Sequence, residues 1–373
     1  MTRSKRNYEL AAKPADRIFP APRLPYEPPQ PRRYPPKIGL IGCGGITASH
    51  LRAYRAANWS VVAMCDRNLA AAELRRREFY PQAQVYQDYR QLLARPDVDV
   101  VDIALHPEPR AAVIAAALNA GKHVLSQKPF VLDLDVGKRL VALARRRKRL
   151  LAVNQNGRWA PYFSYLYQAV RAGCVGDVQT VSMQLNWDHT WIRNTPFEKM
   201  PHVLLYDFAI HWFDMTARFF QDRKARAVFA FNARAPGQSV KPPLLGGATV
   251  AFVNGMATLH FDAHSRFDSR ESIGITGTTG TLRAEGAICA AHQVTLTNRR
   301  GMARPELTGK WFDDGFRGAM GELLCAIETG RTPANAAETV LPGLALCFAA
   351  VQSARCGEAV VPGTVRKLNN ESP

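Results

Sequence analysis

The sequence predicts an α/β protein with two domains. The first is a doubly wound parallel sheet, and the second is an α+β domain with a largely antiparallel open sheet. Its 373 residues exceed what one ordinary hydrophobic core uses. A glycine-rich turn follows the first strong apolar run, and short apolar runs alternate with helical patterns up to about residue 155. Beyond that point the pattern changes to runs of strands with few helices.

Residues 1–36 form a separate zone, a basic N-terminal arm with eight prolines between positions 20 and 36. Proline opposes helix and favours extended backbone. The arm is therefore either disordered or laid across the body of a subunit, and its candidate anchors are Tyr8, Phe19, Leu24, Tyr26 and Tyr34. It carries no apolar stretch typical of a secretory signal, so we expect a cytoplasmic protein.

The region 37–155 is predicted to be the parallel-sheet domain. Strands are expected near 37–42, 60–66, 83–86, 98–105, 122–126 and 150–154, with helices between them. Alternating strands and helices imply right-handed crossovers, and ligands of such sheets bind beyond the carboxyl ends of the strands.

The turn after the first strand has the pattern of a dinucleotide site. Gly42 allows a tight turn, and Gly44 lets the backbone approach a pyrophosphate. The helix that begins near Ile46 supplies N–H donors and the positive end of its dipole. Asp66 ends the second strand 24 positions after Gly42 and can accept hydrogen bonds from an adenosine ribose. Glycine turns also occur in unrelated α/β proteins, but the acid at this spacing favours a dinucleotide.

The region 156–373 is predicted to bind substrate and to mediate oligomerisation. Helices are expected at about 160–172, 203–220, 316–329 and 335–356, and strands at 178–187, 225–233, 247–262 and 271–276. Runs of strands with helices on one side indicate an α+β domain.

Lys128 is the first candidate catalytic residue. It follows the fifth strand within Ser126-Gln127-Lys128-Pro129, where Pro129 fixes the exit of the chain. A cation at this edge can hydrogen-bond a substrate hydroxyl and stabilise a developing alkoxide. The alternative is a solvent-exposed lysine at a strand end.

Asp207, His211 and Asp214 form the second candidate cluster. Their i, i+4 and i+7 spacing places them on one face of an otherwise apolar helix. His211 can act as a general base near neutral pH, while Asp207 can orient its imidazole or bind a substrate hydroxyl. The alternative is a core histidine satisfied by a neighbouring acid. A metal site with His202 matches no common ligand spacing, and no metal is expected.

Further polar and aromatic residues are candidate ligands of a polyhydroxylated substrate. Trp187 and His189 follow the first strand of the second domain, where rings can pack on sugar C–H faces while polar groups bind hydroxyls. Packing at an interface is the equally open alternative. Asn156 and Arg158 follow the sixth strand and can contact nicotinamide or substrate, or serve only as loop residues.

The composition limits the other function classes. The formal charge of +18 is spread along the chain, and its densest runs, at 75–77 and 145–149, lie in the last turns of predicted helices. We therefore expect no nucleic-acid partner. No apolar run reaches membrane-spanning length, and the seven cysteines are scattered without a C-x-x-C motif, which favours a reducing compartment.

Taken together, the motifs resemble the Gfo/Idh/MocA oxidoreductase family, named for glucose-fructose oxidoreductase and inositol dehydrogenase, over about 37–369. The motifs are the Gly42-x-Gly44 turn, Asp66, the segment 120–125, Lys128-Pro129, Asp207 with His211, Gly277-Thr278-Thr279-Gly280-Thr281-Leu282 and the segment 326–333. The resemblance implies a Rossmann domain, an α+β domain whose open sheet mediates a homodimer or homotetramer, and catalysis by Lys128, Asp207 and His211.

The implied activity is an NAD(P)-dependent dehydrogenase of a sugar, cyclitol or related polyol. Asp66 favours NAD, although Arg67 can pair with the extra phosphate of NADP. The expected cofactor-binding residues are Gly42, Gly44, Gly45, Ile46, Asp66, Arg67, His106, Pro107, Gln127, Lys128 and Asn156, and the expected substrate-binding residues are Arg158, Trp187, His189, Asp207 and His211. An NAD-dependent glycosidase on this scaffold and a non-catalytic ligand sensor are the alternatives.

The sequence departs from the family pattern at four positions. Gln127 stands in place of the usual glutamate before the lysine, Thr47 in place of a small residue after the glycine turn, His106 in place of Thr or Ser, and Arg110 in place of histidine.

Overall fold

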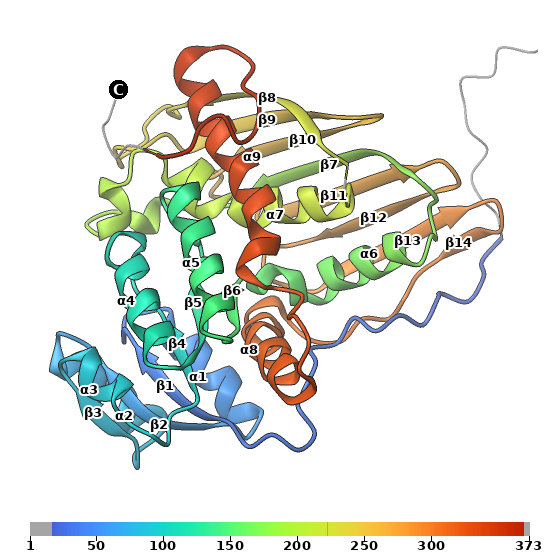
Figure 1. Cartoon of the computed structure of the whole chain (residues 1–373). Coiled ribbons are helices and arrows are strands. Elements are labelled where there is room, and N and C mark those ends of the chain that lie inside the picture. The colour runs from blue at the N-terminus through green and yellow to red at the C-terminus, as the bar shows by residue number, and fades with distance from the viewer. Residues whose placement is uncertain (1–16, 222, 369–373) are drawn as a thin grey trace, which may run out of the picture.

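The computed structural model describes residues 17–221 and 223–368, which form two adjoining sheets with their helices (Figure 1). The first sheet is parallel, with the strand order β3-β2-β1-β4-β5-β6. Its strands are β1 (Lys37–Ile41), β2 (Ser60–Cys65), β3 (Gln84–Tyr86), β4 (Val100–Ile103), β5 (His123–Gln127) and β6 (Leu151–Asn154). The order reverses between β1 and β4, as in a doubly wound fold, so the predicted class of the first domain is confirmed.

Helices cover both faces of this sheet, which explains why its central strands are almost entirely buried. All four residues of β4 are buried. The helices are α1 (Thr47–Ala56), α2 (Leu69–Phe79), α3 (Tyr89–Leu93), α4 (Pro107–Asn119) and α5 (Leu134–Arg146). Side-chain caps fix three of their starts: Asn68 accepts a hydrogen bond from Ala70 N, Asp88 accepts from Arg90 N, and Asp133 accepts from Asp135 N and Val136 N.

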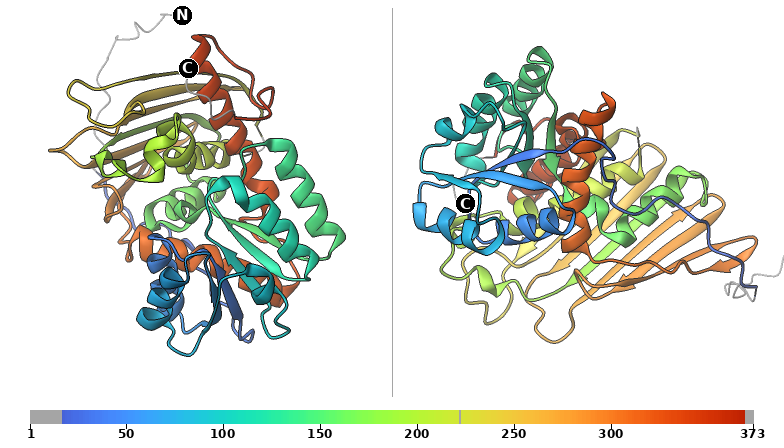
Figure 2. Two further views of the ribbon diagram at one scale, coloured as in Figure 1. Left: turned by 90° about the vertical axis from the view of Figure 1, so that its left-hand side faces the viewer. Right: turned by 90° about the horizontal axis from the view of Figure 1, so that it is seen from below.

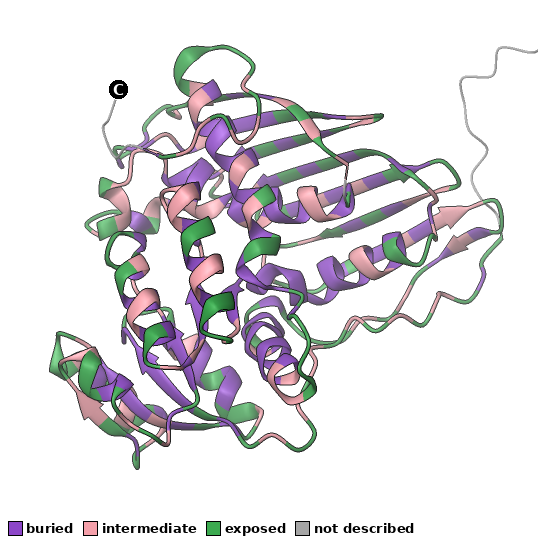
Figure 3. Cartoon of the chain, viewed as in Figure 1, coloured by how far each residue is buried: buried purple, intermediate pink, exposed green. Residues whose placement is uncertain are grey.

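The second domain is built on a mixed, mostly antiparallel sheet with the order β14-β13-β12-β11-β7-β10-β9-β8. Among its strands as described, β7 and β10 are the one parallel pair, and the other pairs are antiparallel. Its strands are β7 (Val178–Asn186), β8 (Ala225–Ala233), β9 (Leu245–Phe252), β10 (Gly255–Asp262), β11 (Arg270–Gly277), β12 (Gly280–Gly286), β13 (His292–Asn298) and β14 (Gly301–Ala303). Buried and exposed residues alternate along the strands (Figure 3), and helices cover only one face, so the predicted open sheet is confirmed.

The helical segments of this domain lie between its sheet and the first domain. They are η1 (Asn156–Trp159), α6 (Pro161–Arg171), η2 (Thr190–Ile192), η3 (Pro196–Lys199), η4 (Val203–Phe208), α7 (Ile210–Phe219), α8 (Trp311–Thr329) and α9 (Ala337–Cys356). By length and composition α9 could cross a membrane, but most of it is buried and it packs against β8 and α7. The α8 helix packs against α1 and contributes Phe316 and Met320 to the core of the first domain.

Two predicted elements differ from the structure. The run 247–262 is a hairpin, because Asn254 adopts a left-handed conformation, with φ of 56°, between β9 and β10. The helix predicted over 203–220 begins as the π-helical turn η4, and α7 starts only at Ile210. Three further strands, β12 to β14, extend the sheet beyond the predicted runs.

The described part of the N-terminal arm lies across its own subunit, along α6 and α8 to the edge strand β14 (Figure 2). Phe19 is buried, and its backbone N donates to Met302 O over 2.9 Å. The Glu328 carboxylate accepts backbone hydrogen bonds from Arg32, Arg33 and Tyr34. The other predicted anchors Leu24, Tyr26 and Tyr34 are partly buried, and Tyr8 lies outside the described residues.

Candidate active site

The glycine turn after β1 leaves room for a phosphate group. Gly42 has a φ of +92°, and a Cβ there would lie 2.7 Å from Ala104 O, so only glycine fits. Cβ atoms at Gly44 and Gly45 would meet nothing within 4 Å, which means that these positions border open space beside the start of α1. Open backbone at a helix N-terminus fits a pyrophosphate.

The Asp66 carboxylate is fixed at the end of β2, next to this turn. Its Oδ2 accepts a hydrogen bond of 2.7 Å from Cys43 N, and its Oδ1 accepts one of 2.8 Å from Asn68 N. Each oxygen retains a lone pair for a ribose hydroxyl. The residues present therefore fit the adenosine half of a dinucleotide. Arg67 is exposed nearby.

Arg75 is a residue that the sequence analysis missed at this turn. Its guanidinium lies 3.3 Å from Thr47 Oγ1 and 3.4 Å from Gly44 O, and Glu78 holds it from the other side at 2.8 Å. Thr47 is itself fully buried and donates to Gly44 O. The run 75–77 lies in the last turns of a helix, as predicted, and its first residue also reaches the glycine turn.

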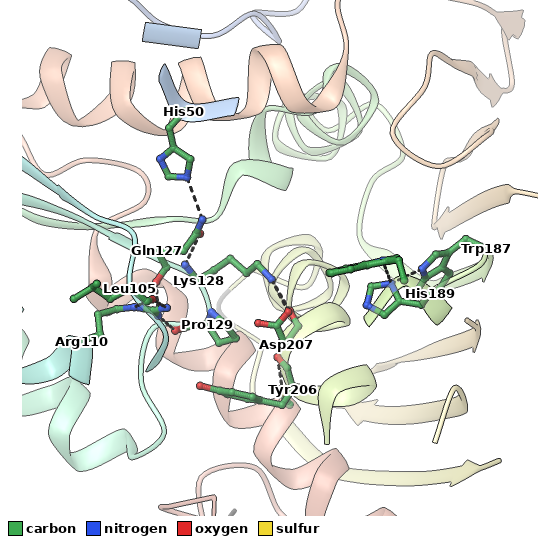
Figure 4. Close-up of polar contacts among 12 residues, drawn as sticks. His50, Leu105, Arg110, Gln127, Lys128, Pro129, Trp187, His189, Tyr206 and Asp207 are labelled. Atoms are coloured by element: carbon green, nitrogen blue, oxygen red, sulfur yellow. Dashed lines mark hydrogen bonds and ion pairs between the residues drawn. The ribbon is translucent and has the colours of Figure 1, made fainter. Parts of the chain in front are cut away.

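The catalytic-lysine candidate lies in a turn fixed by a buried arginine. Lys128 follows β5 and is joined to Pro129 by a cis peptide bond. Arg110 donates to Leu105 O and Gln127 O over 2.9 and 2.7 Å, and also to Pro129 O. Burial lowers the pKa of Arg110 to about 10. This arginine, which replaces the family's usual histidine, ties the loop after β4 to the lysine turn (Figure 4).

Lys128 is paired with Asp207. Its Nζ donates to Asp207 O over 2.8 Å and to Asp207 Oδ2 over 3.1 Å, and both side chains are mostly but not fully buried. The structure therefore brings the first domain's lysine and the second domain's aspartate together (Figure 4). An ammonium has three N–H donors, and two of them are used here, so one remains for a bound oxygen.

A buried polar chain reaches the same turn from α1. His50 Nδ1 lies 2.7 Å from Asp102 Oδ2, which also accepts a 2.7 Å hydrogen bond from Tyr54. On its other side, His50 Nε2 is 3.1 Å from Gln127 Nε2, while Gln127 Oε1 accepts from Lys128 N over 2.7 Å. These hydrogen bonds fix the orientation of the Gln127 amide: its NH2 group donates to His50, and its oxygen accepts from the backbone N of Lys128.

His211 does not pair with Asp207 as its spacing predicted. The π-helical turn η4 ends just before α7, so the two residues do not occupy one regular helical face, and the Asp207 carboxylate binds Lys128. His211 packs edge-on against Trp311 with ring centroids 5.3 Å apart. Burial, reinforced by the charge of Lys128, lowers the pKa of His211 well below its usual range. Its Nδ1 is buried without a partner among the described residues, whereas Nε2 is not enclosed in this way.

The Arg158 guanidinium is engaged in internal contacts, contrary to its predicted contact with substrate, whereas Asn156 makes one internal contact through its amide oxygen. Arg158 and Asp214 form a buried bidentate ion pair with N–O distances of 2.7 and 2.6 Å. Arg158 also donates to Ala334 O. Asn156 Oδ1 accepts from Trp311 Nε1 over 2.9 Å. These contacts occupy the arginine fully, and so we do not retain it as a substrate ligand.

Aromatic side chains border the Lys128–Asp207 pair. Trp187 stacks on Phe208 with ring centroids 4.0 Å apart, and Phe208 lies edge-on to His189 at 4.6 Å. His106, which caps the start of α4 ahead of the buried Pro107, lies 5.5 Å from Phe197. Among the residues predicted for substrate, Trp187, His189 and Asp207 are thus adjacent. Among the described residues, no group of three or more His, Cys, Asp and Glu side chains is arranged to hold a metal ion.

A parallel doubly wound sheet with a glycine turn, an acid at the end of the second strand and an open-sheet second domain are the features of a two-domain dinucleotide-binding protein. The family model described as an oxidoreductase family with an NAD-binding Rossmann fold matches residues 36–155, and the Gfo/Idh/MocA C-terminal domain matches residues 163–283. The chain belongs to the Gfo/Idh/MocA family. The resemblance inferred from the motifs is confirmed, together with the enzyme class, an NAD(P)-dependent dehydrogenase, and NAD as cofactor.

Three similar proteins share between 20% and 30% of their residues with this chain. The D-apiose dehydrogenase of Paraburkholderia graminis is 25% identical over 358 residues, covering 90% of this chain and 92% of the relative. The inositol 2-dehydrogenase of Salmonella paratyphi B is 30% identical over 182 residues, covering 48% of this chain and 53% of the relative. An Agrobacterium radiobacter oxidoreductase, solved with NAD+, L-tartaric acid and magnesium, superposes with a TM-score of 0.80 at 20% identity, covering 88% and 99% of the two chains.

Proposed function

We propose that this protein oxidises a hydroxyl-bearing carbon of a sugar, cyclitol or related polyol, with NAD as the hydride acceptor. The observation that carries the proposal is the Lys128–Asp207 pair, which stands at the carboxyl end of β5 beside His211 and the polar aromatic residues Trp187 and His189. Two sequence relatives are named for the oxidation of D-apiose and of inositol, both polyhydroxylated.

The proposed roles follow from the contacts of each side chain. Lys128 Nζ donates a hydrogen bond to the reacting hydroxyl oxygen and stabilises its growing negative charge. Asp207 holds the ammonium in place. His211, which burial keeps neutral, accepts the hydroxyl proton through Nε2. Bound NAD supplies the acceptor for the hydride that leaves the same carbon.

The cofactor would be held by the first domain. The backbone of Gly44, Gly45 and Ile46 faces the pyrophosphate, and Asp66 accepts from the adenosine ribose. A carboxylate there repels the additional phosphate of NADP, so we propose a preference for NAD. His106, Pro107 and Gln127 complete the proposed contacts on the nicotinamide side.

We further propose a cytoplasmic homodimer or homotetramer that assembles through the open sheet. Phe229, Phe231 and Met256 on its uncovered face are 47%, 57% and 44% exposed. Contiguous exposed apolar side chains on one face are typical of an interface. All seven cysteines are free, as in a reducing compartment. Light scattering of Phe229→Asp/Phe231→Asp beside the unmodified protein tests this, and an unchanged molar mass would contradict it.

The activity is tested by incubating the protein with NAD or NADP and a panel containing D-apiose, myo-inositol, pentoses, hexoses and uronates. A dehydrogenase accumulates NADH, as read from its absorbance. A glycosidase with transient oxidation would release sugar from a nitrophenyl glycoside without net NADH. Binding of NAD with neither reaction would instead indicate a sensor, and either of these results would overturn the proposal.

A further inference from the structure

The His189 side chain is held by a rigid segment that follows β7. Its backbone N donates to Ala263 O over 2.9 Å, and the neighbouring Trp187 N donates to Asp262 O over the same distance. The Asp188 carboxylate accepts from both the backbone N and the hydroxyl of Thr190. These contacts fix the position from which the imidazole projects.

Two indole groups bind the same nitrogen of this imidazole. Trp187 Nε1 lies 2.9 Å from His189 Nδ1 (Figure 4). Trp191 Nε1 lies 3.1 Å from the same nitrogen. An indole N–H can only donate, so Nδ1 must be an unprotonated acceptor. A neutral imidazole carries one N–H, which is therefore placed on Nε2.

The imidazole also remains neutral. Burial lowers the pKa of His189 to about 4; Asp207 and Asp188 oppose this shift, and Lys128 adds to it. A second proton would have to enter at Nδ1, where both indoles donate, and neither of them can turn into an acceptor. His189 is thus a fixed donor, unlike an ordinary histidine that serves as donor or acceptor.

The free Nε2–H is available beside the proposed reacting pair. The His189 ring is 4.6 Å from Phe208, the residue after Asp207, and only 4% of His189 is exposed. Nε2 makes no hydrogen bond to any described residue, yet it is not among the buried unpartnered atoms, so it retains access to a ligand.

We propose that His189 is a specificity-determining residue, which presents a fixed Nε2–H donor to an acceptor oxygen of the polyol substrate, while Trp187 and Trp191 act as positioning residues that lock this tautomer. The inference rests on the proposed polyol dehydrogenase function. It implies that the substrate carries, near the reacting carbon, an oxygen that accepts a hydrogen bond. An analogue lacking that oxygen would leave a buried donor unpaired.

The tautomer itself is testable without substrate. In protein labelled with nitrogen-15 histidine, the signal lost in His189→Gln identifies this side chain. We expect the signature of a neutral ring with the proton on Nε2, unchanged between pH 8 and about pH 5. In Trp187→Phe/Trp191→Phe the second tautomer or a protonated ring should appear. Trp59→Phe, a buried tryptophan of the first domain, should change nothing. A proton on Nδ1 in the unmodified protein would overturn the inference.

Kinetics test the role in recognition, with whichever polyol of the D-apiose and myo-inositol panel is oxidised. His189→Phe should raise the KM for the polyol about 10–100-fold, with the KM for NAD within about twofold. His189→Gln, whose amide can donate from the Nε2 position, should recover most of the loss, and His189→Asn should not. Equal polyol KM values for His189→Phe and the unmodified protein would overturn the inference. If no polyol is oxidised, the proposed function is overturned instead, and the tautomer measurement then decides whether His189 is a fixed donor.

Discussion

Nδ1 of His211 has no hydrogen-bond acceptor among the described residues, and this determines how His211 can serve as a base. Taking a proton at Nε2 requires a hydrogen on Nδ1, which is buried without a partner among the described residues. The Asp207 carboxylate, which could have fixed that hydrogen, binds Lys128 at 3.1 Å. His211 is therefore a neutral imidazole that can accept a proton but has no carboxylate to stabilise the resulting charge. The sequence spacing had instead predicted an Asp–His pair.

The substitution His211→Ala should lower kcat by about 10²–10⁴-fold, the usual contribution of a general base, and leave NAD affinity within a few-fold. His260→Ala, on the exposed face of β10, is the matched control. Because the pKa of His211 lies well below its usual range, kcat should not fall as the pH drops through about 6.5. Near-normal turnover of His211→Ala would show that the hydroxyl proton goes to another group.

Asp66 is expected to set the choice of cofactor. Its carboxylate is fixed by Cys43 N and Asn68 N and cannot turn away from a phosphate on the adenosine ribose. Asp66→Ala should raise the ratio of kcat/KM with NADP to kcat/KM with NAD by at least about tenfold. Asp66→Asn removes the charge but keeps a hydrogen-bonding side chain, and so it separates the effect of the charge from that of the hydrogen bonds. A NADP preference in the unmodified protein would contradict the assignment.

At the scale of elements, the turn after β5 depends on the chain from α1 through His50 and Gln127. Replacing Gln127 by alanine leaves Lys128 N without its partner and leaves His50 Nε2 with only the 3.3 Å contact to Asn154 Nδ2, which should cost about 1–3 kcal/mol of stability. In Gln127→Glu, Oε1 still accepts from Lys128 N, but the carboxylate cannot donate to His50 Nε2.

The free energy of unfolding of Gln127→Glu should therefore also fall, because the buried carboxylate loses the hydrogen bond to His50. Urea denaturation of both Gln127 variants beside the unmodified protein measures this, and Gln82→Glu on the surface serves as the control. Unchanged midpoints in both variants would show that the chain does not stabilise the turn.

The arm is the second element with a measurable contribution. It buries Phe19 and engages the Glu328 carboxylate on α8, the helix whose Phe316 packs against His50 at 4.5 Å. Deleting residues 1–34 should lower the free energy of unfolding by at least about 1.5–3 kcal/mol, the value of one buried aromatic side chain, without changing the number of subunits in the oligomer. Urea denaturation and light scattering check both expectations, and an unchanged midpoint would contradict the first.

For the whole molecule, several histidines make stability depend on pH. The pKa values of His123 and His189 are lowered to about 4, chiefly by burial, and those of His202 and His211 are also lowered. Below pH 6.5 these histidines bind protons in the unfolded chain but not in the folded protein. The stability that they contribute is therefore fully present above that pH and is lost as the pH falls towards 4.

Each of these histidines can lower the free energy of unfolding by at most about 1.4 kcal/mol for every unit by which the pH falls. Urea unfolding at pH 7 and pH 5 should show a clear decrease, which becomes smaller in His123→Phe because that variant removes one titrating group. Equal stability at the two pH values would contradict the burial of these side chains as neutral groups.

The sequence predicted those features that depend on neighbouring residues. The Gly42 turn, Asp66 and the lysine turn are local motifs, and alternating strands and helices imply the parallel sheet. The Arg158–Asp214 pair and the Asp102–His50–Gln127 chain join residues far apart in the sequence and leave no periodic pattern. The π-helical turn before α7 was missed because its apolar residues resemble those of a regular helix.

The most direct test of the account measures NADH formation from the polyol panel by the unmodified protein and by Lys128→Met, which has a side chain of similar length without the charge. We expect NADH from at least one polyol with the unmodified protein, a turnover lower by about 10²–10³-fold in the variant, and NAD binding preserved in both. Full turnover in Lys128→Met, or NAD binding without NADH from any polyol, would contradict the claim that the Lys128–Asp207 pair carries polyol oxidation.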